Sequence, residues 1–142
     1  MVTPNTPEPR KPLPQPTVLC IDDDPIVLYF LRDFLTAHGY RALTVTDGLP
    51  GIELAQHTRP DVILLDIMLR GLSGYDICRK FRADPAFHDI PIILLTVLDD
   101  PSVATIGRAA GADLILHKPA DPEAIVRAIE WILRRKREAP TA

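Results

Sequence analysis

The sequence contains only two cysteines and no long apolar run among its 142 residues. Cys20 and Cys78 lie in apolar patterns without the spacing of metal ligands, which predicts small core residues in a reducing compartment. No apolar stretch reaches the roughly 18 residues that suggest a membrane span, and the proline-rich N-terminus does not resemble a signal peptide. We therefore predict a cytoplasmic protein that does not cross a membrane.

Neither sign of charge is in large excess, since the formal net charge is −3. With 46% hydrophobic and 25% charged residues, the composition is typical of a globular protein. It gives no general reason to expect nucleic acid as a partner. The basic run at 134–137 is interpreted as a solvated helix end whose cations face the negative end of the helix dipole, with nucleic-acid contact as the weaker alternative.

Proline is concentrated in the first 16 residues, which hold almost no large apolar side chains. Such a segment cannot bury enough surface to offset its ordering entropy. We expect residues 1–16 to form a disordered arm, residues 17–137 one folded domain and residues 138–142 a short tail. The arm is interpreted as a linker, although residues 10–16 would also fit a polyproline-binding groove.

From Thr17 onward, short aliphatic runs alternate with segments of helical period. The runs are bounded by polar or turn residues, as strands buried on both faces should be. The predicted strands are 17–21, 41–45, 62–65, 92–95 and 114–116. One helix is expected after Asp24, with Pro25 in its first turn and Gly39 as its stop. Further helices are expected at 50–57, 74–82 and 102–110 and along an apolar stripe at 125–132.

This alternation implies an α/β fold, namely a doubly wound five-stranded parallel sheet with helices on both faces. Ligands bind at the carboxyl ends of the strands in this class. Asp22 and Asp23 follow the first predicted strand, and Asp66 ends the third. Thr96 ends the fourth strand, and Lys118 follows the fifth. We therefore expect these five side chains to converge at one edge of the sheet.

Three carboxylates held together repel one another unless a divalent cation neutralises them, and Mg²⁺ suits a site of oxygen ligands. A phosphoryl donor could then approach Asp66, whose carboxylate would attack phosphorus in line. Lys118 and the Thr96 hydroxyl could stabilise charge on the phosphoryl oxygens. Gly71 and Gly74 indicate turns rather than a phosphate-cradling loop, and the four scattered histidines favour surface positions over a metal site. The pattern predicts an aspartyl-phosphate switch.

Four motifs, at 21–25, 64–74, 91–96 and 111–119, together resemble the receiver domains of two-component response regulators. The resemblance covers residues 17 to about 135 and implies a flavodoxin-like (βα)5 fold with strand order 2-1-3-4-5. It implies a signalling switch that assists its own phosphotransfer and dephosphorylation rather than an enzyme. The expected donor is a phosphohistidine on a histidine kinase or phosphotransfer protein. We expect a stand-alone receiver that signals through phosphorylation-dependent binding of a downstream protein.

The family's residue roles carry over by position. They are Asp66 as phosphoacceptor, Asp23 and Asp66 as direct Mg²⁺ ligands, Asp22 as a ligand through water, the Met68 backbone carbonyl as a further ligand, Thr96 as the phosphate-sensing hydroxyl and Lys118 as the charge-pairing cation. The resemblance also implies a cis peptide bond between Lys118 and Pro119.

Three positions depart from the family pattern. Arg70 replaces a usual proline and adds a cation near the site. Val97 replaces a small residue, so its branched side chain is expected to narrow the path to Asp66 and to slow phosphotransfer. Ile115 replaces an aromatic residue that moves inward on activation. Isoleucine has no ring or hydroxyl to respond to movement of Thr96, so the side chain that usually couples the site to the output is missing.

Met68 and Leu98 occupy the positions at which the family tunes hydrolysis, and apolar side chains cannot orient an attacking water. We therefore expect a long-lived phosphorylated form. Trp131 lies about 100° or more from the apolar stripe of the last helix, so partial exposure is expected. With Ile115 it could form a partner or homodimer surface over the fourth helix, fifth strand and fifth helix, or it could pack at a core margin.

Two other functions stay open. The fold could serve as a phosphorylation-independent binding module, with the three departures as signs of a relaxed site. The chain could also be a metal-dependent phosphatase with Asp66 as nucleophile, similar to haloacid-dehalogenase-like enzymes. Such enzymes use a second aspartate two residues later, where this chain has Met68. That difference ranks the phosphatase last.

Overall fold

The computed structural model describes residues 15–138. The strands are β1 (Thr17–Ile21), β2 (Arg41–Val45), β3 (Val62–Asp66), β4 (Ile92–Thr96) and β5 (Leu114–His117). The helices are α1 (Pro25–Ala37), α2 (Gly48–Thr58), α3 (Gly74–Ala83), α4 (Ser102–Ala110) and α5 (Pro122–Glu138), with a short 3₁₀ turn, η1 (Pro85–Phe87), after α3. The arm predicted at 1–16 and the tail predicted at 138–142 lie mostly outside the described residues and stay predictions.

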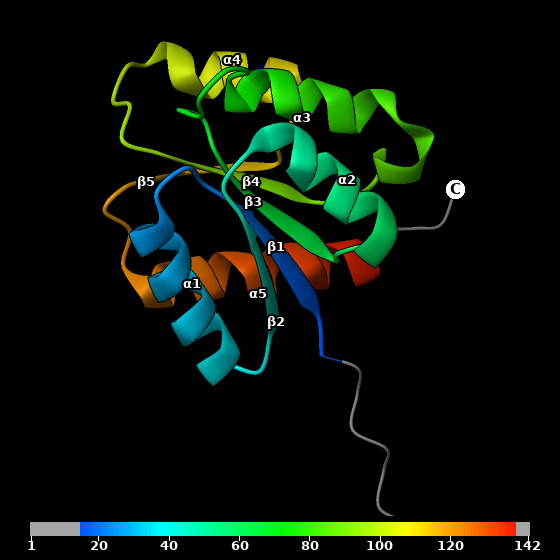
Figure 1. Ribbon diagram of the computed structural model, residues 1–142, viewed down its shortest axis with the longest axis vertical. Helices are drawn as coiled ribbons and strands as arrows, with labels where there is room; N and C mark the ends of the chain where they lie inside the picture. The colour runs from blue at the N-terminus through cyan, green and yellow to red at the C-terminus, as the bar shows by residue number, and fades with distance from the viewer. Residues whose placement is uncertain (1–14, 139–142) are drawn as a thin grey trace, which may run out of the picture.

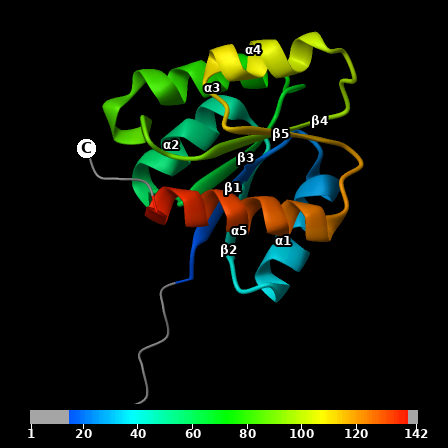
Figure 2. The same cartoon turned by 180° about the vertical axis from the view of Figure 1, so that it is seen from behind.

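All five strands are parallel, and their order is β2-β1-β3-β4-β5. Figure 1 shows α2, α3 and α4 along one face of the sheet and α1 with α5 along the other, and Figure 2 shows the same arrangement from behind. The predicted doubly wound fold and its strand order are confirmed. Strand and helix ends differ from the predicted ones by a few residues, as at β3, which extends to Asp66.

Alternate residues of the strands feed two separate cores, because successive side chains of a strand point to opposite faces. Under α2, α3 and α4, the strands contribute Leu19, Ile21, Ile63, Leu65, Ile92 and Leu94. Under α1 and α5, they contribute Val18, Cys20, Val62, Leu64, Ile93 and Leu95. Both sets are almost fully buried, which explains why the runs of the central strands are continuously apolar.

The predicted N-cap and first-turn proline of α1 are both present. The Asp24 side chain accepts a hydrogen bond from the Ile26 amide at 2.9 Å, and Pro25 stands at the first helical position. Both cysteines are buried core residues, as predicted, and their thiols are free. Burial raises the pKa of Cys20 to about 12 and that of Cys78 to about 11, so both thiols stay protonated at neutral pH.

A side chain outside the sequence motifs, Arg82, ties the far end of α3 to three other segments. The Arg82 guanidinium donates to the carbonyls of Gly111 at 2.8 Å, Ile90 at 2.6 Å and Phe87 at 3.0 Å. It also pairs with the Asp113 carboxylate at 2.8 Å, and that carboxylate accepts the amide of Ile92 at 2.8 Å. Arg82 therefore joins α3, η1, the start of β4 and the end of α4.

Arg82→Met is expected to lower the free energy of unfolding by about 2 kcal/mol, because part-buried carbonyls lose a charged donor. Arg79→Met is the matched control, since Arg79 pairs with Asp76 at 3.0 Å on an exposed helix face. Its loss should be about 0.5 kcal/mol or less. Urea unfolding of both variants measures the difference. Equal losses would contradict the bridging role of Arg82.

Candidate functional site

The carboxyl ends of the parallel strands bring the predicted polar side chains to one edge of the sheet. Asp22 follows β1, Asp66 ends β3 and Thr96 ends β4, and they are the buried polar or charged residues of the described chain. Asp23 lies beside Asp22 and is half-buried. Asp22, Asp23 and Asp66 each offer a carboxylate oxygen, and these oxygens lie within 4.8 Å of one another.

Lys118 brings the fifth strand into this cluster. Its ammonium donates to Asp22 Oδ2 and lies 3.5 Å from Asp66 Oδ2. Its own amide donates to the Thr96 carbonyl at 2.7 Å, which holds the residue at the end of β4. The bond from Lys118 to Pro119 is cis, as expected. One cation thus faces two of the three clustered carboxylates.

The Asp66 carboxylate is held in a fixed orientation. Its Oδ1 accepts the Met68 amide at 3.1 Å, while Oδ2 faces Lys118. Burial raises the pKa of Asp66, the Met68 amide and Lys118 lower it, and the nearby Asp22 carboxylate raises it; the net direction is upward. The buried position of Asp66 therefore disfavours the charged form of its carboxylate.

The acidic cluster fits a hard divalent cation by the chemistry of its donors. Within residues 15–138, the Asp23 carboxylate and the Met68 carbonyl take part in no hydrogen bond or ion pair. Both are oxygen acceptors beside Asp66, and Mg²⁺ prefers oxygen ligands of this kind. The residues present could therefore hold Mg²⁺ through Asp23, Asp66 and the Met68 carbonyl, with Asp22 alongside.

Thr96 has no exposed surface. Its Oγ1 accepts the amide of Leu98 at 3.0 Å, so the hydroxyl is tied to the loop that follows β4. In the register of the parallel pair, Thr96 stands opposite His117 of β5. The place of Thr96 at the edge of the site was predictable from the sequence, but this bond to the loop was not.

Gly71 and Gly74 play different parts in the loop between β3 and α3. Gly71 has a φ of 82°, in agreement with the predicted turn. Gly74 is the first residue of α3, as the helix predicted at 74–82 implies, and the turn interpretation was wrong for it. Its amide donates to the Ile67 carbonyl at 2.7 Å, and an added Cβ would lie 2.2 Å from the Asp66 carbonyl oxygen. Gly74 lets α3 approach the main chain of Asp66.

The positions that depart from the family pattern lie around this edge. Val97 and Met68 are 61% and 51% exposed, and Arg70 is exposed as well. Leu98 is half-buried. Ile115 is also half-buried and packs on the α4 side of the sheet, where a Cβ on Gly107 would lie 2.7 Å from its Cδ1. Ile115 therefore fills the space under α4 with an aliphatic side chain.

The family model of the response regulator receiver domain matches residues 18–130. The chain belongs to the response regulator receiver family. It is 34% identical over 116 residues to protein PilH of Pseudomonas aeruginosa, covering 82% of this chain and 96% of PilH. The structure of the chemotaxis protein CheY4 of Vibrio cholerae matches with a TM-score of 0.81 and 28% identity, over 84% of this chain and 99% of CheY4.

This receiver is also similar to longer regulators. It is 35% identical over 123 residues to the DNA-binding response regulator MtrA of Mycolicibacterium smegmatis, covering 87% of this chain and 53% of MtrA. The chain thus spans about half the length of several curated relatives that it matches. Receivers are signalling switches of phosphorelays rather than conventional enzymes. No helix among residues 15–138 is long and apolar enough to cross a bilayer.

Proposed function

We propose that this receiver is a switch in which Asp66 accepts a phosphoryl group from a phosphohistidine in a Mg²⁺-dependent reaction. The observation that carries the proposal is the pairing of a buried, oriented Asp66 carboxylate with one fixed cation, Lys118, and one unpartnered carboxylate, Asp23. The phosphorylated form then binds a downstream protein. The family supplies the general expectation of a histidine kinase or phosphotransfer protein as donor.

Asp66, Lys118 and Thr96 have separate roles in phosphoryl transfer. The Asp66 carboxylate forms the bond to phosphorus as the bond from phosphorus to the imidazole nitrogen breaks, and the electron pair of that bond stays on the nitrogen. Bound Mg²⁺ would supply positive charge beside the phosphoryl oxygens. Lys118, 3.5 Å from Asp66 Oδ2, adds a second positive charge, and the Thr96 hydroxyl can donate to a phosphoryl oxygen.

The acyl phosphate is proposed to be long-lived. Hydrolysis needs a water held in line with the bond from phosphorus to Asp66, and a polar side chain at the rim of the site could orient it. Met68 and Leu98 offer no hydrogen-bonding side chain at the two rim positions. The receiver's contribution to its own dephosphorylation would therefore be small, and decay of the acyl phosphate within seconds would contradict this part of the proposal.

Acetyl phosphate provides the direct test of the proposed function. We expect an intact-mass gain of one phosphoryl group with Mg²⁺ and none when the metal is chelated. Borohydride reduction of the acyl phosphate followed by peptide mapping should place the modification at Asp66. No gain at saturating donor would favour the phosphorylation-independent binding module. A gain that maps to another residue would exclude Asp66 as the acceptor.

The first turns of α1 offer a contact surface for the protein donor. Ile26, Tyr29 and Phe30 are 66%, 68% and 60% exposed, and the two rings meet edge to face at 5.7 Å. Positions 26, 29 and 30 share one side of a helix. Since α1 begins at Pro25, two residues after Asp23, this apolar stripe starts close in the sequence to the acidic cluster. Exposed apolar residues grouped in this way mark interaction surfaces.

Tyr29→Ala is therefore expected to slow phosphoryl transfer from a phosphorylated histidine phosphotransfer protein about tenfold, as loss of an interface aromatic often does. Phosphorylation by acetyl phosphate should be unchanged, because a small donor needs no docking surface. Trp131→Ala is the matched control, since Trp131 is a 44% exposed aromatic on α5. Stopped-flow or quench-flow measurement of transfer checks both variants, and equal rates for Tyr29→Ala and wild type would contradict donor docking on α1.

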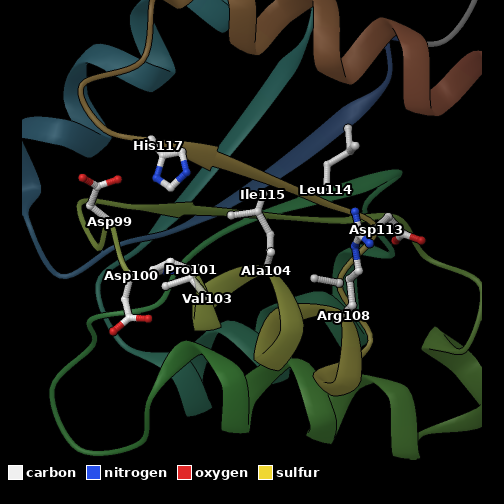
Figure 3. A pocket seen from close by; sticks show the side chains of 11 residues that line it. Asp99, Asp100, Pro101, Val103, Ala104, Arg108, Asp113, Leu114, Ile115 and His117 are labelled. Atoms are coloured by element: carbon white, nitrogen blue, oxygen red, sulfur yellow. The ribbon is translucent and has the colours of Figure 1, made fainter.

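The downstream partner or a second copy of the chain is proposed to bind over α4, β5 and α5. The hollow between α4 and β5 has a volume of about 320 Å³. Figure 3 shows the side chains that line it, with Ile115 pointing toward Ala104. Trp131 is partly exposed on α5, as predicted from its angle to the apolar stripe, and the Arg135 guanidinium lies 4.8 Å from its ring centroid. A hollow on a helix–strand face and an exposed aromatic side chain are each typical of surfaces that bind another protein.

A further inference from the structure

A chain of hydrogen bonds leads from the buried Thr96 hydroxyl to the protein surface. Thr96 Oγ1 accepts the Leu98 amide at 3.0 Å. The Leu98 carbonyl is bonded to His117 Nδ1 at 3.1 Å. His117 stands opposite Thr96 in the strand register, and the next residue, Lys118, donates its amide to the Thr96 carbonyl. Leu98 is thus held from both sides, by the hydroxyl on one and by the imidazole on the other.

His117 is exposed and lines the hollow between α4 and β5. Figure 3 shows its ring at the end of β5, beside the loop that carries Asp99 and leads into α4. Ile115, two residues earlier on the same strand, has no polar atom in its side chain and is packed under α4 at Gly107. Of these two neighbours on β5, His117 is the one that has a hydrogen bond to the loop after Thr96.

We propose that His117 is a positioning residue that couples the Thr96 hydroxyl to the segment between β4 and α4. The proposal rests on the proposed phosphorylation of Asp66. A phosphoryl group is a charged acceptor and forms stronger hydrogen bonds than a neutral group does. If the Thr96 hydroxyl turns toward it, the Leu98 amide loses its acceptor. The Leu98 backbone then reorients and its carbonyl leaves His117, which frees the start of α4 to move.

The tautomer of His117 reports this change. A carbonyl oxygen only accepts hydrogen bonds, so Nδ1 must carry the proton while the bond to Leu98 exists. Once the carbonyl leaves, the neutral ring can hold its proton on Nε2 instead. The two tautomers have different nitrogen chemical shifts, so the imidazole itself shows whether the bond is present. A merely structural histidine would keep its tautomer on phosphorylation.

Two substitutions separate the hydrogen bond from the size and polarity of the side chain. In His117→Asn, the amide nitrogen falls close to the place of Nδ1 and can still donate to Leu98. In His117→Gln, the amide nitrogen falls near the place of Nε2 and points past that carbonyl. Both variants keep a neutral polar side chain at the end of β5, and neither touches the clustered carboxylates.

The experiment phosphorylates wild type and both variants with acetyl phosphate and Mg²⁺ at about pH 8, above the ordinary histidine pKa of about 6.5. Intact mass gives the phosphorylated fraction, nitrogen-15 spectra give the tautomer of His117, and amide exchange follows residues 98–104. We expect equal phosphate in all three proteins and loss of the Nδ1–H tautomer in phosphorylated wild type. Exchange at 98–104 should rise about fivefold in wild type and the Asn variant and less than about twofold in the Gln variant.

The outcomes distinguish this inference from the function on which it rests. Equal phosphate with the same exchange response in all three proteins would overturn the role of His117 and leave the switch intact. An unchanged His117 tautomer in phosphorylated wild type would overturn it too. Absence of phosphate from wild type would overturn the proposed function and, with it, the coupling through His117.

Discussion

Asp66→Asn is expected to abolish the Mg²⁺-dependent phosphate gain and, at the same time, to stabilise the metal-free protein. The first effect follows because an amide is a poor nucleophile toward phosphorus. The second follows from the surroundings of Asp66, which is 6% exposed and close to the Asp22 carboxylate. An amide of the same shape keeps the packing and removes a buried charge. The residue that would make the switch work therefore weakens the fold.

The pH dependence of stability has a definite sign. Burial raises the pKa of Asp66 in the folded protein above its value of about 3.9 in an unfolded chain. Between those two pKa values, the folded state binds more protons than the unfolded state, so the free energy of unfolding falls as pH rises. Above the folded pKa, the full penalty is present. Without metal at pH 7, Asp66→Asn should therefore be more stable than wild type.

Urea unfolding of both proteins from pH 4 to 8 with a chelator measures this difference. The gap between them should widen as pH rises. Added Mg²⁺ should stabilise wild type by mass action and have a smaller effect on the variant. Asp33→Asn is the control, because Asp33 is an exposed carboxylate on α1, and its effect should stay within about 0.5 kcal/mol. Phosphate on Asp66→Asn, or a loss of stability in it, would contradict the assignment.

The strands and the convergence of the acidic residues could be predicted because they depend on local pattern and on one topological rule. Continuous aliphatic runs such as those of β3 and β4 identify strands buried on both faces. Once the strands are known to be parallel, their carboxyl ends must share an edge, so Asp22, Asp66 and Thr96 must be neighbours. No information about distant packing is needed for either step.

The main-chain contacts of Arg82, His117 and Gly74 could not be predicted, because main-chain partners brought close by packing are not encoded by residue type. The Gly111 carbonyl is 29 residues from Arg82 in the chain, and the Leu98 carbonyl is 19 residues from His117. Every residue type except proline has the same amide and carbonyl, so these partners leave no trace in the sequence. His117 is exposed, as predicted for the scattered histidines, but its bond to the Leu98 carbonyl could not be predicted.

Gly74→Ala is expected to cause the largest loss of stability among the changes considered, about 3 kcal/mol or more. An alanine Cβ would lie 2.2 Å from the Asp66 carbonyl oxygen and 2.6 Å from the Ile67 Cα. Both contacts are with main chain, so no side-chain rotation can relieve them. Either α3 moves away from the sheet or the end of β3 shifts. Because one of these contacts is with the main chain of Asp66, the acceptor carboxylate should also move away from Lys118.

Urea unfolding and acetyl phosphate labelling, carried out where the variant is still folded, test both consequences. Gly39→Ala is the matched control, since Gly39 has a φ of 88° and no atom within 4 Å of an added Cβ. Its cost should be the left-handed backbone penalty of about 1 to 2 kcal/mol, with normal phosphate uptake. If Gly74→Ala lost no more stability than Gly39→Ala and was labelled normally, the close approach of α3 would not determine the position of Asp66. A larger loss together with slow labelling would make the glycine part of the site's framework, although it has no functional group of its own.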